Sequence, residues 1–280
     1  MKLTLVVFLI TIFPSLSLLH GQGNETEDEP LEAILPDRDW KNAALLYFNS
    51  ASFEVNRIRA QGNPDKRMGF YADALEAIHS PGGTQEDLEK ARETLSALAV
   101  GDANDDLTMA AKFYLIRIVH RHQAIPDPEL AARLYRDLFL ENPDHYFGQM
   151  ALQMHAFIVL NLSVDELVIE ETFAELERLG EDVSIPDPRR GFHRVLGEAY
   201  VFHGLSNRKA FEHLKIAFEL GFPLSRTQVG PLLQLGELAE NLGEKGYAIQ
   251  LYSDFLSSPR NSLRRNEVEA RLANLGAAVN

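Results

Sequence analysis

The sequence predicts an all-α protein, and three observations lead to that prediction. From Asp37 onward, apolar residues recur at the helical spacing i, i+3, i+4 and i+7, without a convincing alternation of period two. Short segments rich in proline, glycine and aspartate separate these stretches, as at Asn142-Pro143-Asp144. Small or branched residues also recur with a period of 38 to 41 residues. These patterns predict about twelve helices, joined by loops short enough for sequence neighbours to pack antiparallel.

Residues 1–23 have the pattern of a secretory signal peptide. Lys2 supplies a positive charge, the apolar run Leu3–Phe13 follows, and glycines stand at positions 21 and 23. The run has about eleven residues, whereas a membrane span needs roughly 20. We therefore expect an exported protein, periplasmic or secreted, with no membrane span after signal cleavage. An uncleaved N-terminal anchor is the alternative.

Residues 24–36 form a predicted acidic leader. Five carboxylates lie in this stretch, and no basic residue occurs before Arg38. Such a block repels itself and buries little apolar surface, so we expect it to be disordered.

Residues 37–260 form the predicted helical-repeat domain. One column of small or branched positions recurs along it, with steps of 40, 38, 41 and 38 residues: Ala91, Ala131, Ile169, Ala210 and Ala248. A small residue lets two helices approach closely, and a bulky residue one turn later fills the gap beside it. In the best unit the pattern is Ala248-x3-Tyr252-x2-Phe255-x3-Pro259, in which proline ends the helix.

These motifs resemble tetratricopeptide repeats. The first helix of such a unit is represented by Trp40-x2-Ala43-Ala44-x2-Tyr47 and by Leu196-Gly197-x2-Tyr200. The segment Leu196–Phe222 is also similar to Sel1-like repeats. The resemblance implies a right-handed α-solenoid of stacked antiparallel helix pairs. Together with the signal peptide it indicates an exported bacterial member of this family.

Residues 261–280 are predicted to form a C-terminal capping helix. Leu263, Val268, Leu272 and Leu275 supply an apolar face, and three arginines accompany them on the polar side. A solenoid needs such a polar-backed helix to cover its last repeat. A basic docking patch is the alternative.

Composition and motifs exclude several classes of function. The net charge of -14 disfavours nucleic-acid binding, which needs a basic surface. The chain has no cysteine, and it lacks HExxH, GxSxG, GxGxxG and Walker-type motifs. We therefore predict no catalytic, cofactor-binding or metal-binding residues, and we interpret the nine histidines as ordinary helix-surface residues.

The resemblance also assigns candidate binding residues. In such repeats, first-helix positions line a concave groove that binds protein or peptide. Carried over to this sequence, those positions are Ile116, His120, Arg194, Glu198, Val201, Phe202, Leu233, Glu237, Glu240 and Asn241. The glutamates make the groove acidic, which would suit a basic or helical peptide. The alternative is that these residues are solvated polar groups and interhelix packing.

The sequence thus favours an exported, non-catalytic helical-repeat scaffold that binds a protein or peptide in a periplasmic or envelope assembly. An enzyme, or the accessory domain of an enzyme, built on an α-solenoid is the first alternative. A structural solenoid without a specific ligand is the second.

The signal-peptide prediction has a direct test. N-terminal sequencing of the protein from its native source should give a mature chain that begins near Gln22 or Asn24, because signal peptidase cuts after small residues. Intact Met1 in the membrane fraction would contradict the prediction.

Overall fold

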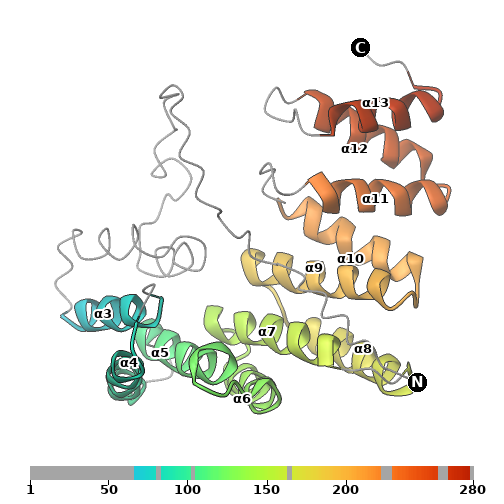
Figure 1. The fold of residues 1–280 in the computed structure, drawn as a ribbon. Coiled ribbons are helices and arrows are strands. Elements are labelled where there is room, and N and C mark those ends of the chain that lie inside the picture. The colour runs from blue at the N-terminus through green and yellow to red at the C-terminus, as the bar shows by residue number, and fades with distance from the viewer. Residues whose placement is uncertain are drawn as a thin grey trace, which may run out of the picture. The chain divides into compact units, whose positions relative to one another are not determined.

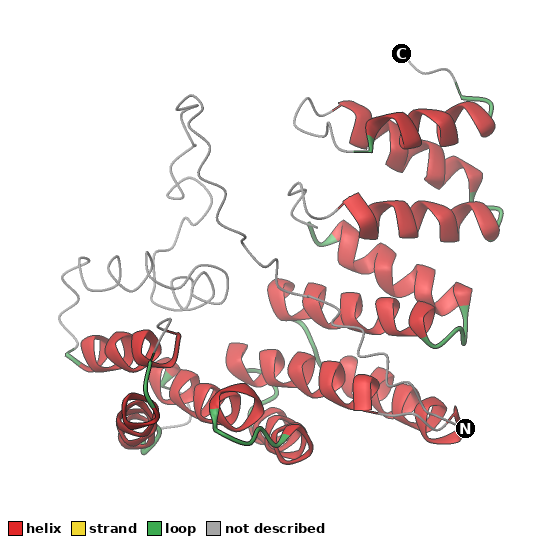
Figure 2. Cartoon of the chain, viewed as in Figure 1, coloured by secondary structure: helices red, strands yellow, loops and turns green. Residues whose placement is uncertain are grey.

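In the computed structural model, the residues described are 66–79, 83–101, 105–162, 166–221, 229–257 and 264–277. Every regular element in these ranges is a helix, and they contain no strand (Figure 2). The all-α prediction is confirmed for this part of the chain. The predicted signal peptide and acidic leader lie outside the described residues. No helix in the described ranges is long and apolar enough to cross a membrane.

The chain divides into two compact units, and the first ends at Val100. In it, helix α3 (Arg67–His79) packs against α4 (Gln85–Leu98). Thr84 starts α4 with a capping box: its hydroxyl accepts from the Asp87 N–H at 3.2 Å, and the Asp87 carboxylate accepts from the Thr84 N–H at 2.9 Å. Tyr71, Leu75 and Leu95 are buried in this unit.

The second unit begins at Gly101. Helix α5 (Asp106–Arg117) continues directly into a π-helical turn, η2 (Ile118–His122). The α-helices described in this unit are α5 (Asp106–Arg117), α6 (Pro128–Glu141), α7 (Tyr146–Leu162), α8 (Glu166–Gly180), α9 (Pro186–Phe202), α10 (Asn207–Glu219), α11 (Val229–Asn241), α12 (Lys245–Ser257) and α13 (Arg265–Asn274).

Sequence neighbours pack together throughout the second unit. The most extensive contacts join α9 to α10 and α6 to α7, and α10 to α13 follow one another in contact (Figure 1). Two contacts skip a helix, because α7 packs on α9 and α5 packs on α7. The helix predicted near the C-terminus is present as α13, which buries Val268 and Leu272 and packs on α12.

The predicted column of small and branched residues is a column of buried positions. Its five members lie one each on α4, α6, α8, α10 and α12, and each is at most 2% exposed. The period of 38 to 41 residues found in the sequence is therefore the length of one pair of helices with its loops. At the four alanine positions, the small side chain lets neighbouring helix backbones approach closely.

Two glycines lie at close contacts within helix pairs. A Cβ atom on Gly197 of α9 would lie 2.6 Å from the Leu214 Cγ and 3.0 Å from the Leu214 backbone nitrogen on α10. A Cβ on Gly236 of α11 would lie 2.3 Å from the Tyr252 hydroxyl oxygen on α12. Both helix pairs therefore need a residue without a side chain at these positions.

We predict that Gly197→Ala lowers the free energy of unfolding by roughly 1–2 kcal/mol. Overpacking a tight contact costs about 1–3 kcal/mol, and the better helix propensity of alanine recovers up to about 1 kcal/mol. Chemical denaturation measures the change. Gly246→Ala is the matched control, because a Cβ at Gly246 of α12 meets nothing within 4 Å. Equal stabilities of the two variants would show that the α9–α10 contact is not tight.

Candidate functional site

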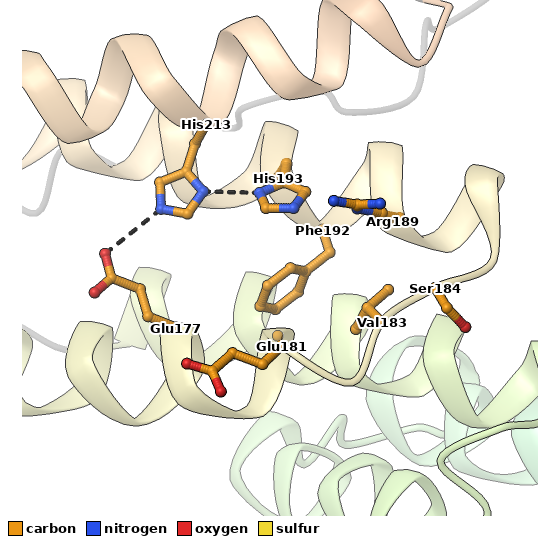
Figure 3. Close-up of a pocket in the computed structure, with 9 residues that line it drawn as sticks. Glu177, Glu181, Val183, Ser184, Arg189, Phe192, His193 and His213 are labelled. Atoms are coloured by element: carbon orange, nitrogen blue, oxygen red, sulfur yellow. Dashed lines mark hydrogen bonds and ion pairs between the residues drawn. The ribbon is translucent and has the colours of Figure 1, made fainter.

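A pocket of about 290 Å³ lies among α8, α9, α10 and the turn that joins α8 to α9 (Figure 3). Its wall combines carboxylates, imidazoles and an arginine with an apolar floor. The lining residues are Glu177, Gly180, Glu181, Val183, Ser184, Arg189, Phe192, His193 and His213.

Local sequence features build the α9–α10 hairpin that carries the histidines. Pro186 begins α9, and a proline is favourable in the first helical turn. After α9, Gly204 adopts a φ of 65°, a left-handed conformation that glycine takes without strain. The Ser206 hydroxyl then accepts from the Lys209 N–H at 3.3 Å and caps α10. The chain reverses here, so α10 returns along α9.

Two histidines from the facing helices meet in the pocket. The Nδ1 atom of His193 on α9 lies 2.8 Å from the Nδ1 atom of His213 on α10 (Figure 3). The other ring nitrogen of His213, Nε2, lies 3.5 Å from a carboxylate oxygen of Glu177 on α8. A carboxylate and two imidazoles therefore form one line of contacts across three helices.

Glu177 is the centre of this polar cluster. Its carboxylate accepts from the Tyr200 hydroxyl at 2.6 Å and from the Lys209 ammonium at 2.7 and 2.9 Å. Burial raises the pKa of Glu177, but the hydrogen bonds from Lys209 and Tyr200 outweigh it, so the net pKa lies below the usual value. Glu177 is therefore ionised at neutral pH and can only accept hydrogen bonds.

The two histidines are neutral at the same pH. The pKa of His193 is lowered to about 4. Burial is the main cause, and the nearby His213 and Arg189 contribute to the same shift. Burial also lowers the pKa of His213, against the opposing effect of Glu177. Neutral imidazole has one donor and one acceptor nitrogen, which matches a chain of single hydrogen bonds.

Aromatic rings hold the cluster in place. The Tyr200 ring stacks on Phe173 of α8 with centroids 3.9 Å apart, and on His213 with centroids 5.8 Å apart. The Lys209 ammonium lies 5.6 Å from the centroid of the same ring. The Tyr200 hydroxyl is thereby fixed toward Glu177.

No group of three or more histidine, aspartate or glutamate side chains that could hold a metal ion occurs in the described ranges. No family model, curated protein or solved structure matches the chain.

Four of the predicted binding residues lie together on one stripe of α9. Arg194, Glu198, Val201 and Phe202 are spaced i, i+4, i+7 and i+8, which places them on the same side of a helix. The Arg194 Nε donates to the Glu198 carboxylate at 2.8 Å. Phe202 ends the stripe with 55% of its surface exposed.

The predicted acidic residues on α11 contact the C-terminal helix. Arg271 of α13 forms ion pairs with Glu237 and, at 3.3 Å, with Glu240. The Tyr252 hydroxyl also donates to Glu240 at 2.6 Å. Asn241, at the end of α11, is exposed. Glu237 and Glu240 therefore form their ion pairs within the chain, with Arg271 of α13.

The other three predicted residues are packed inside. Leu233 is 2% exposed, and Ile116 and His120 are each 8% exposed. His120 lies on η2, where its ring meets Tyr135 of α6 edge-on with centroids 6.2 Å apart. Burial is the main cause that lowers the pKa of His120 to about 4. These three side chains contribute to helix packing.

Sequence reasoning did not select the cluster around Glu177. It treated His193 and His213 as ordinary helix-surface residues, and it used Tyr200 only as a repeat position. Glu177 and Lys209 are 32 residues apart, so no local motif joins them. The position of His193 and His213 on opposite sides of a helix–helix turn is the one signal that could have paired them.

The histidine pair predicts a measurable loss of stability in acid. The folded-state pKa of His193 lies below the value of about 6.5 in an unfolded chain, so unfolding takes up protons as the pH falls from 6.5 toward 4. Stability that is complete above pH 6.5 should therefore decline through this window.

In His193→Gln, the drop in unfolding free energy between pH 7 and pH 4.5 should be smaller than in the parent protein by about 2 kcal/mol. Urea denaturation at the two pH values measures it. Ser184→Ala, which changes the pocket without removing a titratable group, should keep the parental drop. An unchanged drop in His193→Gln would show that His193 is not held neutral by the fold.

Proposed function

We propose that this protein is an exported, non-catalytic helical-repeat scaffold that binds a protein or peptide partner in a periplasmic or envelope assembly. The observation that carries the proposal is the stripe on α9. It combines an ion pair, Arg194–Glu198, with an exposed aromatic side chain, Phe202. Aromatic residues next to charged rims are the typical centres of protein-binding surfaces.

The proposed architecture is a right-handed α-solenoid of stacked antiparallel helix pairs, as in tetratricopeptide repeats. Two features of the described residues support it. The small-residue column falls on every second helix, and α7 packs on α9 while α5 packs on α7. A stack of helix pairs places alternate helices side by side in this way. Export rests on residues 1–23, and the proposed location is the periplasm or the exterior of the cell.

The proposed partner carries basic side chains on a helix. The contact between α11 and α13 is an internal example of this recognition, because Arg271 on a helix is held by Glu237 and Glu240. A partner helix could be bound in the same manner beside Glu198, with an apolar residue against Phe202. Helix recognition commonly uses such apolar positions flanked by charges.

A second candidate function, an enzyme or enzyme accessory domain on an α-solenoid, is favoured by one observation. The line Glu177–His213–His193 ends in a pocket, and carboxylate–imidazole contacts are the usual components of acid–base sites.

The partner-binding proposal predicts that Phe202→Ser weakens partner capture at least about tenfold, because truncating a central aromatic side chain typically costs 2 kcal/mol or more of binding energy. The experiment is affinity capture from the native envelope fraction, with partners quantified by mass spectrometry. The melting temperature should stay unchanged, since the Phe202 ring is mostly exposed.

Ile125→Ser is the matched control, because Ile125 is also an exposed apolar residue of the second unit but is not part of the α9 stripe. It should capture the same partners as the parent protein. If Phe202→Ser and Glu198→Lys both leave capture unchanged, the α9 stripe is not the binding surface.

A further inference from the structure

The hydrogen bonds around Glu177 fix the proton positions on both imidazoles. Since ionised Glu177 can only accept, the Nε2 atom of His213 must be the donor in their contact. Neutral His213 then has its lone pair on Nδ1. The Nδ1 atom of His193, 2.8 Å away, must therefore donate its proton to that lone pair.

This assignment leaves a lone pair on Nε2 of His193. The described part of the chain provides no hydrogen-bond partner for that nitrogen, and His193 lines the pocket (Figure 3). Imidazole in water favours the opposite tautomer, with the proton on Nε2. The line of contacts thus selects the form in which the outer nitrogen is a nucleophile and proton acceptor.

We propose that Nε2 of His193 is a nucleophilic site for small acyl donors such as esters, and that Glu177 and His213 are positioning residues that hold it in the reactive tautomer. The proposal goes beyond the binding of a partner at the α9 stripe and stands independently of it.

The chemistry balances with the groups present. Nε2 of His193 attacks the acyl carbon, a C–N bond forms, and the C–O bond to the leaving alcohol breaks. The Nδ1 proton of His193 moves to Nδ1 of His213, and the resulting imidazolium is stabilised by the Glu177 carboxylate. The leaving alkoxide takes a proton from a water molecule and becomes the alcohol. The hydroxide that remains attacks the acyl carbon, the C–N bond breaks, and the carboxylic acid is released. The proton on Nδ1 of His213 then returns to Nδ1 of His193, which restores the starting tautomers.

The pocket offers suitable surroundings for a small acyl group. Phe192 and Val183 form an apolar floor, and a volume of about 290 Å³ admits a small ester. Arg189 precedes His193 by one helical turn on α9 and also lines the pocket. Its guanidinium supplies positive charge for the oxyanion that develops on the acyl oxygen.

The charged groups around His193 set its behaviour with pH. Glu177 of α8, Glu181 of the turn after α8, Arg189 of α9 and His213 of α10 line the same pocket. Lys209 of α10 pairs with Glu177. With a pKa of about 4, His193 is mostly neutral at pH 5, whereas an ordinary histidine with a pKa near 6.5 is only about 3% neutral there. Acylation at pH 5 therefore distinguishes His193 from exposed histidines.

The first test treats the full-length protein with diethyl pyrocarbonate at pH 5 and maps the modified residues by peptide mass spectrometry. We expect His193 to be modified at least about fivefold faster than an exposed histidine in an unstructured reference peptide, given the difference in neutral fraction. Glu171→Gln, which changes an exposed carboxylate of α8 that does not line the pocket, should retain this rate. Modification of His193 at the reference rate would overturn the proposal.

The second test separates positioning from structure. Nitrogen-15 NMR of the parent protein at pH 6 should show His193 protonated on Nδ1 and bare on Nε2, and this result does not depend on any variant folding. Glu177→Gln should lower the modification rate at least about threefold and restore the Nε2–H tautomer. An Nε2–H tautomer in the parent protein, or an unchanged rate in folded Glu177→Gln, would refute the role of Glu177 and His213.

Discussion

Close approach of neighbouring helices at small residues is the constraint on which the second unit depends. Where Gly197 faces Leu214 and Gly236 faces Tyr252, any side chain on the glycine would collide with the opposite helix. Interiors packed to this density do not absorb an added methyl group without movement of the backbone. The small positions therefore set how near the helices lie, and that spacing determines which side chains can reach one another across the pairs.

The polar cluster at Glu177 is a consequence of that spacing. Lys209 and Tyr200 reach the Glu177 carboxylate because α9 and α10 pack closely on each other and α8 lies beside them. The Lys209 ammonium and the Tyr200 hydroxyl both donate to the Glu177 carboxylate and keep it ionised. Partial burial alone would favour its protonated form. The charge of Glu177 in turn orders the two imidazoles, so one glutamate controls the protonation of a pocket that it lines.

The C-terminal helix shows how the same chemistry serves packing. Arg271 contacts two glutamates of α11, while Val268 and Leu272 on the same helix are buried. The charges at the end of the chain thus specify where α13 lies, and the apolar face supplies most of the burial energy. Glu237 and Glu240 are therefore engaged within the chain, and the partner surface proposed above is the stripe on α9.

The sequence by itself determined the helical class, the positions of the breaks and the column of buried small residues from Ala91 to Ala248. These features are local or periodic, and each can be recognised from a short window because helix geometry imposes the 3.6-residue spacing. The sequence also grouped Arg194, Glu198, Val201 and Phe202, because residues on one helix keep their spacing in any fold.

Only the tertiary structure decided which predicted groove residues are buried or paired. Leu233 and His120 have the same helical spacing as exposed residues, and their burial depends on helices that arrive from elsewhere in the chain. The meeting of Glu177, His193 and His213 was likewise beyond sequence patterns, because it joins three helices at distances set by packing. A pKa or a tautomer follows from such neighbours, so the chemistry of the pocket emerges only when the helices are in place.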